Sequence, residues 1–138
     1  MLYNLIFYGT LKDLNLLQKT IEMNPVKIRY GFIKGTLFEV NDIFEPNGIT
    51  KYPIAISNGN DFILSLMVSY NLKEKEFKSL LKKILIFEGC LYKYKKLTFL
   101  DFNGVKEEGV AFIAKDKNII KNDLRISPVK PFGKIYLW

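Results

Sequence analysis

Glu88 is the side chain in this sequence that is best placed to move a proton. It stands in Ile86-Phe87-Glu88-Gly89, at the carboxyl end of an amphipathic pattern, with glycine where a helix is commonly capped. A carboxylate there faces the negative pole of the helix, and its apolar neighbours predict partial burial, so both effects raise its pKa. The pattern therefore predicts a general base. The alternative is a carboxylate that reaches water or pairs with Lys93 or Lys95.

A second candidate is the tetrapeptide Tyr8-Gly9-Thr10-Leu11, which lies between an apolar strand and a capped helix. Glycine permits backbone conformations that are closed to other residues, so successive N–H groups can converge on an anion. The loop therefore predicts an anion-binding site in which Gly9, Thr10 and Leu11 contribute backbone groups. The alternative is an ordinary turn between a strand and a helix.

The composition restricts the chemistry that is available. The sequence has no histidine, which excludes Ser-His-Asp and Cys-His pairs and any metal site that needs imidazole. We expect no metal and no cofactor. Cys90 is the single cysteine, so no internal disulfide can form, and we expect a reducing, cytoplasmic setting. Because no base is evident for its thiol, we interpret Cys90 as a small core residue.

The charge balance allows a different class of function. The formal net charge is +7, which suits nucleic acid or a small anion, although a basic surface can also lack a ligand. Lysines and aromatic residues alternate from Leu91 to Phe99, and on a curved sheet such a run can stack single-stranded nucleic acid. The alternative is an edge strand whose lysines oppose aggregation while its aromatic residues face the core.

The length of 138 residues predicts one domain, 1–138, with no membrane span and no secretion signal. Turn signals include Asn58-Gly59, which predicts a hairpin between its flanking strands, and Asn47-Gly48. Hydrophobic periodicity predicts helices from Asp13, as the N-cap, to about Met23 and from Asn71 to Phe87. It predicts strands at Leu2–Phe7, Gly31–Val40 (with Gly35 as a bulge or close approach), Tyr52–Ser57, Phe62–Tyr70, Lys95–Phe102, Gly109–Ala114 and Gly133–Trp138. Six or seven strands with about two helices indicate an α+β fold with a strongly curved sheet or a small barrel.

The order of these weak signals resembles the gamma-glutamylcyclotransferase-like family, which includes gamma-glutamylamine cyclotransferases, AIG2-like and BtrG-like proteins. That family opens with Tyr-Gly-Ser/Thr-Leu, as at Tyr8-Gly9-Thr10-Leu11. Gly35-Thr36-Leu37-Phe38 and Tyr52-Pro53 are similar to its next elements. Its signature helix ends in Glu-Gly and is followed by Tyr-Arg-Arg, matched by Glu88-Gly89 and Tyr94-Lys95-Lys96. The Asp that precedes the Glu is absent here, no Gly-Glu is evident in Phe62–Tyr70, and both arginines are lysines.

The resemblance implies a small mixed β-barrel with flanking helices around a cavity. It implies a cofactor-independent enzyme of the transferase or lyase type that releases 5-oxoproline from a small gamma-glutamyl amine or peptide. Glu88 would be the catalytic acid and base, and Tyr8, Gly9, Thr10, Leu11 and Tyr94 would bind the substrate. Two alternatives stay open: a basic barrel that binds RNA or single-stranded DNA, and a non-catalytic relative that binds another small anion.

Overall fold

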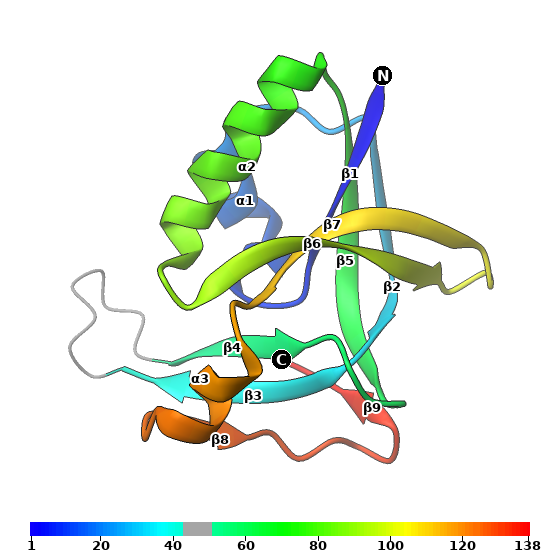
Figure 1. Ribbon diagram of the computed structural model, residues 1–138. Helices are drawn as coiled ribbons and strands as arrows, with labels where there is room; N and C mark the ends of the chain where they lie inside the picture. The colour runs from blue at the N-terminus through cyan, green and yellow to red at the C-terminus, as the bar shows by residue number, and fades with distance from the viewer. Residues whose placement is uncertain (43–50) are drawn as a thin grey trace.

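Five strands form a closed barrel at the centre of the computed structural model, which describes residues 1–42 and 51–138 (Figure 1). The strands follow the order β1-β7-β6-β2-β5, and pairing of β1 with β5 closes the ring. The barrel is mixed because β1 and β7 run parallel, whereas its other pairs are antiparallel. The bounds are β1 Leu2–Phe7, β2 Lys27–Lys34, β5 Phe62–Asn71, β6 Tyr92–Asp101 and β7 Lys106–Ala114, and the short β9 Ile135–Tyr136 adds to β5.

A second sheet of three strands lies beneath the barrel, in the order β4-β3-β8 (Figure 1). Its strands are β3 Thr36–Asn41, β4 Lys51–Ile56 and β8 Ile126–Pro128. The single strand predicted for Gly31–Val40 is therefore wrong, because β2 and β3 belong to different sheets. The chain divides at Gly35, where a Cβ atom would lie 2.5 Å from the carbonyl oxygen of Ile56. The predicted close approach at Gly35 is confirmed.

The predicted hairpin across Asn58-Gly59 is also wrong. Both flanking strands form, but β4 pairs with β3, whereas β5 pairs with β1 and β2. The long ladders that β5 makes within the barrel replace the local pairing, since strand pairs are stabilised by their cross-strand contacts. Gly59 adopts a φ of +117° in the turn that carries the chain from one sheet to the other.

Two helices, α1 (Leu14–Ile21) and α2 (Glu74–Glu88), lie side by side on one face of the barrel (Figure 1). The Asp13 carboxylate caps α1, as predicted, by accepting hydrogen bonds from the N–H groups of Asn15 and Leu16. The short helix α3 (Lys117–Asn122) and strand β8 were not predicted from the sequence. The Asn47-Gly48 turn lies outside the described residues.

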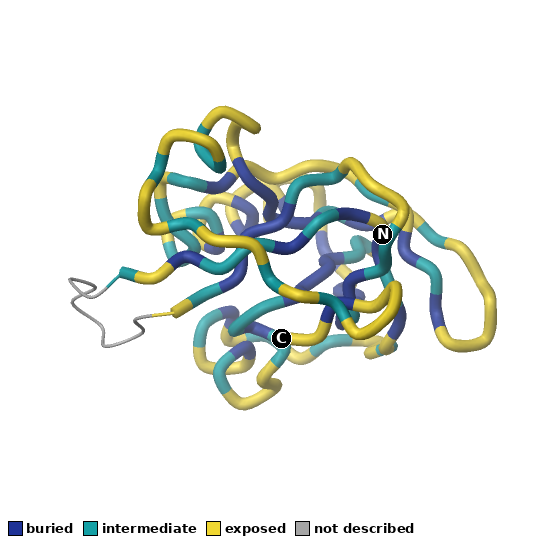
Figure 2. The backbone as a smooth tube through the Cα atoms, turned by 90° about the horizontal axis from the view of Figure 1, so that it is seen from below, coloured by how far each residue is buried: buried dark blue, intermediate teal, exposed yellow. Residues whose placement is uncertain are grey.

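From Leu5 onward, the residues of β1 are buried and contribute alternately to two clusters of the core. Figure 2 shows buried residues gathered toward the middle of the molecule, with exposed residues along its outer loops. Leu5 and Phe7 pack in the cluster beneath α1 and α2. Ile6 and Tyr8 pack inside the barrel, in a cluster to which all five barrel strands contribute. The loop that follows β1 is therefore anchored on both sides. In the part of the chain that is described, no helix is long and apolar enough to cross a membrane.

Candidate active site

The loop after β1 meets the last turn of α2 at a small inner pocket. The short 3-10 helix η1 (Thr10–Lys12) begins directly after Gly9, and Glu88 is the last residue of α2. The cavity volume is about 10 Å³, close to that of one water-sized sphere. The residues that line it are Ile6, Phe7, Tyr8, Gly9, Thr10, Leu11, Pro53, Glu88 and Phe112. The prediction that Glu88 and the Tyr8–Leu11 loop border one pocket is confirmed.

Glu88 is half-buried, and burial raises its pKa from 4.5 to about 7. The direction is the one expected from the sequence. No described lysine or arginine forms an ion pair with this carboxylate. Lys95, one of the two expected alternative partners, instead donates a hydrogen bond to the Ser57 hydroxyl at 3.2 Å. Gly89 ends the helix with a φ of +105°, a backbone conformation that favours glycine.

Gly9 is required for a reason other than the one expected. Its φ is −121°, so the loop does not use the left-handed conformation that glycine permits. A Cβ atom at this position would instead lie 2.5 Å from Cγ of Pro53, which packs against the loop. The position of this loop agrees with the sequence prediction. The glycine, however, leaves space for the Pro53 side chain of β4.

The loop has unused backbone donors. Within the described residues, the N–H groups of Gly9, Thr10 and Leu11 donate no hydrogen bond, whereas the N–H of Lys12 donates to the Gly9 carbonyl at 2.9 Å. The Leu11 side chain is buried in the core, so this residue can offer a ligand only its backbone. The three donors are adjacent in sequence and belong to residues that line the inner pocket.

Tyr8 lines the pocket as part of its wall, and its hydroxyl is already engaged. The hydroxyl donates a hydrogen bond to the Phe112 carbonyl at 2.6 Å and accepts one from the Ala55 N–H at 3.1 Å. Burial, with the nearby Glu88, raises the pKa of this phenol far above its ordinary value. Tyr8 therefore joins β7 to β4 and is not available as an acid near neutral pH.

Tyr94 is not brought into either pocket that contains Glu88. Its ring is half exposed and lies edge-on to Phe112, with 6.4 Å between the ring centroids. Tyr92, two residues earlier, contacts a residue of the inner pocket, because its buried hydroxyl donates to the Pro53 carbonyl at 2.5 Å. Burial, together with Tyr8 and Glu88, raises the pKa of Tyr92. The alternation of β6 places Tyr92 and Tyr94 on one face of the strand, and neither residue is among those that line the two pockets.

A larger outer pocket of about 350 Å³ adjoins the inner one and shares Thr10 and Glu88 with it. Its other lining residues come from the end of α2 and the residues that follow it, from the position after β3, from β4 and from the position before β8: Asp42, Tyr52, Ile86, Phe87, Gly89, Cys90, Leu91 and Arg125. Cys90 is exposed, so its assignment to the core is wrong. It follows the cap of α2, where the chain turns away from the core. No sequence pattern marks Arg125, whereas Pro53 belongs to the Tyr52-Pro53 motif.

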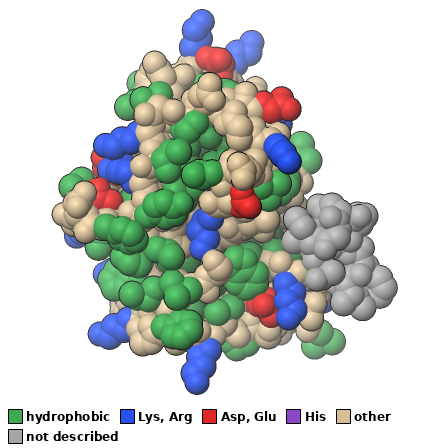
Figure 3. Space-filling model, turned by 180° about the vertical axis from the view of Figure 1, so that it is seen from behind, with side chains coloured by type: hydrophobic (Ala, Val, Ile, Leu, Met, Phe, Trp, Pro, Cys, Tyr) green, Lys and Arg blue, Asp and Glu red, His purple; other side chains and the backbone are tan. Residues whose placement is uncertain are grey.

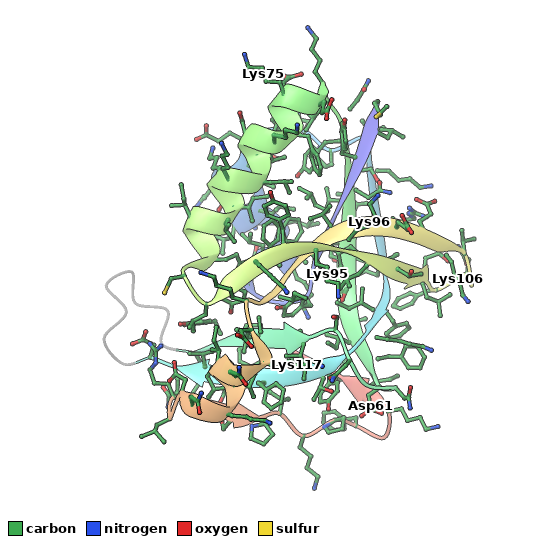
Figure 4. All side chains as sticks on the ribbon, in the orientation of Figure 1. Asp61, Lys75, Lys95, Lys96, Lys106 and Lys117 are labelled. Atoms are coloured by element: carbon green, nitrogen blue, oxygen red, sulfur yellow. The ribbon has the colours of Figure 1, made fainter. Side chains whose placement is uncertain are left out.

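The run from Leu91 to Phe99 is not an aromatic platform. Tyr92 and Phe99 are buried in the core, which leaves Tyr94 as its exposed aromatic ring. The first half of β6 pairs with β7 alone, so its lysines follow an open strand edge, and Lys95 and Lys96 extend from it separately (Figure 4). On the rear face of the molecule, basic side chains are scattered singly around apolar ones (Figure 3). These features fit the edge-strand interpretation.

Within residues 1–42 and 51–138, no three histidine, cysteine, aspartate or glutamate side chains gather as ligands. What the site offers is a single carboxylate with a raised pKa, unused backbone donors and an adjoining cavity.

The comparisons with known proteins show the fold of the chain. No protein-family model matches the sequence, and no curated protein matches it. Among solved structures, At5g39720.1 from Arabidopsis thaliana matches with a TM-score of 0.63 and 15% identity, over 84% of this chain and 70% of that one. A gamma-glutamyl cyclotransferase matches with a TM-score of 0.58 and 12% identity, over 84% and 68%. Allophanate hydrolase from Kluyveromyces lactis matches with a TM-score of 0.59 and 9% identity, over 92% of this chain and 19% of that one.

The chain therefore has the gamma-glutamyl cyclotransferase-like fold. This agrees with the resemblance found in the order of its sequence motifs, and with the small mixed barrel and flanking helices which that resemblance implied. At these identities the comparisons show the architecture. Because one fold can host different activities, the activity depends on the residues of the site.

Proposed function

We propose that this protein is a cyclotransferase that releases 5-oxoproline from a gamma-glutamyl amine or peptide. In this reaction the α-amine of the substrate attacks its own side-chain carbonyl. A bond forms between the α-nitrogen and the δ-carbon, and the bond from the δ-carbon to the leaving amine breaks. The nucleophile is already part of the substrate, so no histidine, metal or redox cofactor is needed.

Glu88 carries this proposal. A bound gamma-glutamyl group presents an α-ammonium, which must lose a proton before it can attack. A carboxylate with a pKa of about 7 and no ion-pair partner among the described residues is suited to accept that proton. It can then deliver that proton to the leaving amine. The α-nitrogen gives up a second proton as the ring forms, and the released amine takes it up and departs as an ammonium ion, so Glu88 returns to its ionised form and the protons balance.

The backbone of the loop would stabilise the developing negative charge. The carbonyl oxygen becomes an oxyanion as the ring closes, and N–H donors aimed at it lower the barrier. The unused N–H groups of Gly9, Thr10 and Leu11 supply donors beside Glu88. We assign to Tyr8 the role of a wall that holds the loop. The position of Tyr94 outside both pockets supports no role for it at the reacting atoms.

The substrate would occupy parts of both pockets. The inner cavity of about 10 Å³ is too small for a complete gamma-glutamyl group, so the reacting atoms would lie at its mouth, between Thr10 and Glu88. The leaving group would then extend into the outer cavity of about 350 Å³.

The experiment is a screen for release of 5-oxoproline over a panel of gamma-glutamyl amines and gamma-glutamyl peptides, read by mass spectrometry. We expect release from at least one member by the wild-type protein and loss of it in Glu88→Gln. The exposed Glu74→Gln, at the other end of α2, serves as the control. Saturable binding of these compounds without any release would instead identify a non-catalytic relative. A protein that does not bind these compounds and does not release 5-oxoproline from them would overturn the proposal.

A further inference from the structure

The outer side of the barrel is only partly covered by helices. Helices α1 and α2 pack over β1 and β5 in one core cluster. The antiparallel register pairs Tyr30 of β2 with Leu66 of β5, so alternate residues of β2 face the same side as this cluster. Ile28 and Tyr30 nevertheless have exposed fractions of 40% and 46%. Strand β2, on the side of the barrel away from α2, therefore presents large apolar side chains to solvent (Figure 1).

Four aromatic side chains gather on this open side, and we call them the aromatic face: Tyr30, Phe32, Phe62 and Phe102. The centroid of the Phe32 ring lies 5.9 Å from that of Phe62 and 5.4 Å from that of Phe102. Phe102 belongs to the turn between β6 and β7 and is 64% exposed. Tyr30 precedes Phe32 by two residues, which places the two side chains about 6.6 Å apart along one side of β2. The four rings therefore lie close together on one surface.

The aromatic face lies on the convex outer surface of a closed barrel. None of its four residues lines the inner pocket, the outer pocket or the groove between α1 and α2. Protein partners are anchored mainly by side chains that fill pockets. A ligand with flat rings, in contrast, needs only exposed rings against which it can stack. The shape of this surface therefore favours a ligand that stacks.

The surroundings of the aromatic face carry more basic than acidic side chains. On β2, β5 and β9, on the residue before β5 and before β9, and in residues 101–107 of the hairpin that joins β6 to β7, they are Lys27, Arg29, Lys34, Lys106 and Lys134 against Asp61, Asp101 and Glu107. Two of these acids already face Arg29, whose guanidinium lies 3.4 Å from Asp101 and 2.6 Å from Glu107. Lys34 lies on the aromatic side of β2, with Nζ 5.8 Å from the centroid of the Phe62 ring. The aromatic face is therefore complementary to an anionic ligand.

Independently of the proposed reaction, we infer that the aromatic face binds single-stranded nucleic acid, either DNA or RNA. Bases stack on the rings, a contact that every base can make because each has a flat π-face. Phosphates bind Lys34, Lys106 and Lys134, none of which forms an ion pair within residues 1–42 and 51–138. The net charge of +7 adds to the attraction of a polyanion. A second copy of the chain would instead bring two sets of lysines together.

This site differs from the run that the sequence pattern indicated. Between Leu91 and Phe99, Tyr94 is the exposed aromatic ring, because Tyr92 and Phe99 are buried. The aromatic face instead combines β2, β5 and the turn between β6 and β7, which are distant in sequence. The pairing of β2 with both β5 and β6 brings them together.

Fluorescence anisotropy tests this inference with labelled oligonucleotides of about 12 nucleotides, a length within the site sizes of small barrels. The probes are an oligothymidylate, an oligouridylate, and an abasic strand with the same phosphates and no bases. We expect at least one base-bearing strand to bind about fivefold or more tightly than the abasic strand, the effect of stacking one base. The logarithm of its affinity should fall against the logarithm of salt concentration with a slope of about −2, for about three phosphate contacts. Equal binding of the abasic strand, or no binding of any strand, would overturn the inference.

Variants locate the binding. Phe102→Ala and Tyr30→Ala each remove an exposed ring and should weaken oligonucleotide binding about fivefold or more. Tyr94→Ala removes an exposed ring from β6 and should bind like the wild type. Lys34→Gln should reduce the steepness of the salt dependence by about 0.7, whereas Lys75→Gln, in the first turn of α2, makes the same change in net charge and should not (Figure 4). Circular dichroism shows whether each variant is folded, and wild-type binding by both folded ring variants contradicts the inference.

Two further measurements separate this inference from other interpretations. Sedimentation with phosphatidylserine vesicles, lost in Phe102→Ala, without any oligonucleotide binding would assign the aromatic face to a lipid surface and overturn the inference. Release of 5-oxoproline should be unchanged in Tyr30→Ala and Phe102→Ala, because neither residue lines a pocket that contains Glu88. Failure of nucleic-acid binding therefore leaves the proposed reaction intact, and failure of the reaction leaves the binding intact.

Discussion

The Pro53 side chain packs directly against Gly9, so that a Cβ atom at position 9 would lie 2.5 Å from Cγ and 3.0 Å from Cδ of the proline. This contact joins the loop after β1 to the second sheet. The carbonyl of the same proline accepts the hydrogen bond of Tyr92. Pro53 thus fixes two parts of the candidate site that are distant in sequence.

Gly9→Ala should destabilise the protein by about 1 to 3 kcal/mol, because the added methyl group overlaps Pro53 and the packed sheet yields little. Chemical denaturation measures this loss. Pro53→Ala opens the space, so the double variant should be more stable than the sum of the single effects predicts. Strict additivity of the two changes would show that the contact does not determine the choice of glycine.

Tyr8→Phe should also reduce stability. The hydroxyl of Tyr8 serves two buried backbone groups, the Phe112 carbonyl and the Ala55 N–H, and its removal leaves both without this partner. A loss of about 1 to 3 kcal/mol follows, measured by urea denaturation. Tyr94→Phe is the control, since its ring is half exposed and should cost little. A Tyr8→Phe protein with wild-type stability would contradict the structural role.

The sequence predicts local features of this protein well. The strand Leu2–Phe7, the cap at Asp13 and the long helix that ends at Glu88 all follow from patterns within a few residues. The nearness of Glu88 to the Tyr8–Leu11 loop is not a local property. It was predicted only because the two signals were interpreted together, with the help of a family resemblance.

Partners across the fold could not be predicted from those patterns. The Asn58-Gly59 turn has the composition of a hairpin, yet its strands find longer ladders in different sheets. The sequence around Gly9 does not indicate that the Pro53 side chain packs against it. Arg125 belongs to no sequence motif. Its position in the outer pocket with Glu88 depends on how β8 pairs with β3, which is a contact between distant parts of the chain. Such contacts are set by tertiary packing.

The stability of Glu88→Gln should depend on pH. In the folded protein burial raises the pKa of Glu88 from 4.5 to about 7, so the folded state holds this proton more tightly than the unfolded state. The wild type therefore loses stability from this group as the pH rises through that interval, and glutamine does not titrate. The two proteins should be similar at about pH 4, and the variant more stable at about pH 8, by at most about 3 kcal/mol.

Thermal melts at both pH values check this difference. Glu74→Gln is the control, because that carboxylate is 74% exposed and loses little hydration on folding. A Glu88→Gln protein no more stable than the wild type at about pH 8 would show that the carboxylate is not significantly desolvated in the folded state.

Glu88→Gln should abolish turnover while it keeps the fold. Glutamine has nearly the same shape and can still hydrogen-bond, but it cannot accept a proton from the α-ammonium of a bound substrate. Loss of general acid and base catalysis costs about 100- to 10,000-fold in rate, far more than the loss of a solvated carboxylate at the surface. In the wild type, kcat/KM should rise as the pH increases through about 7, because only the ionised form of Glu88 is a base. Initial rates of 5-oxoproline release between about pH 5 and 9 measure both effects, since this interval brackets the expected transition. A variant that stays within about threefold of the wild-type rate, far less than the loss of a general base costs, or a flat wild-type profile, removes Glu88 from the role of base.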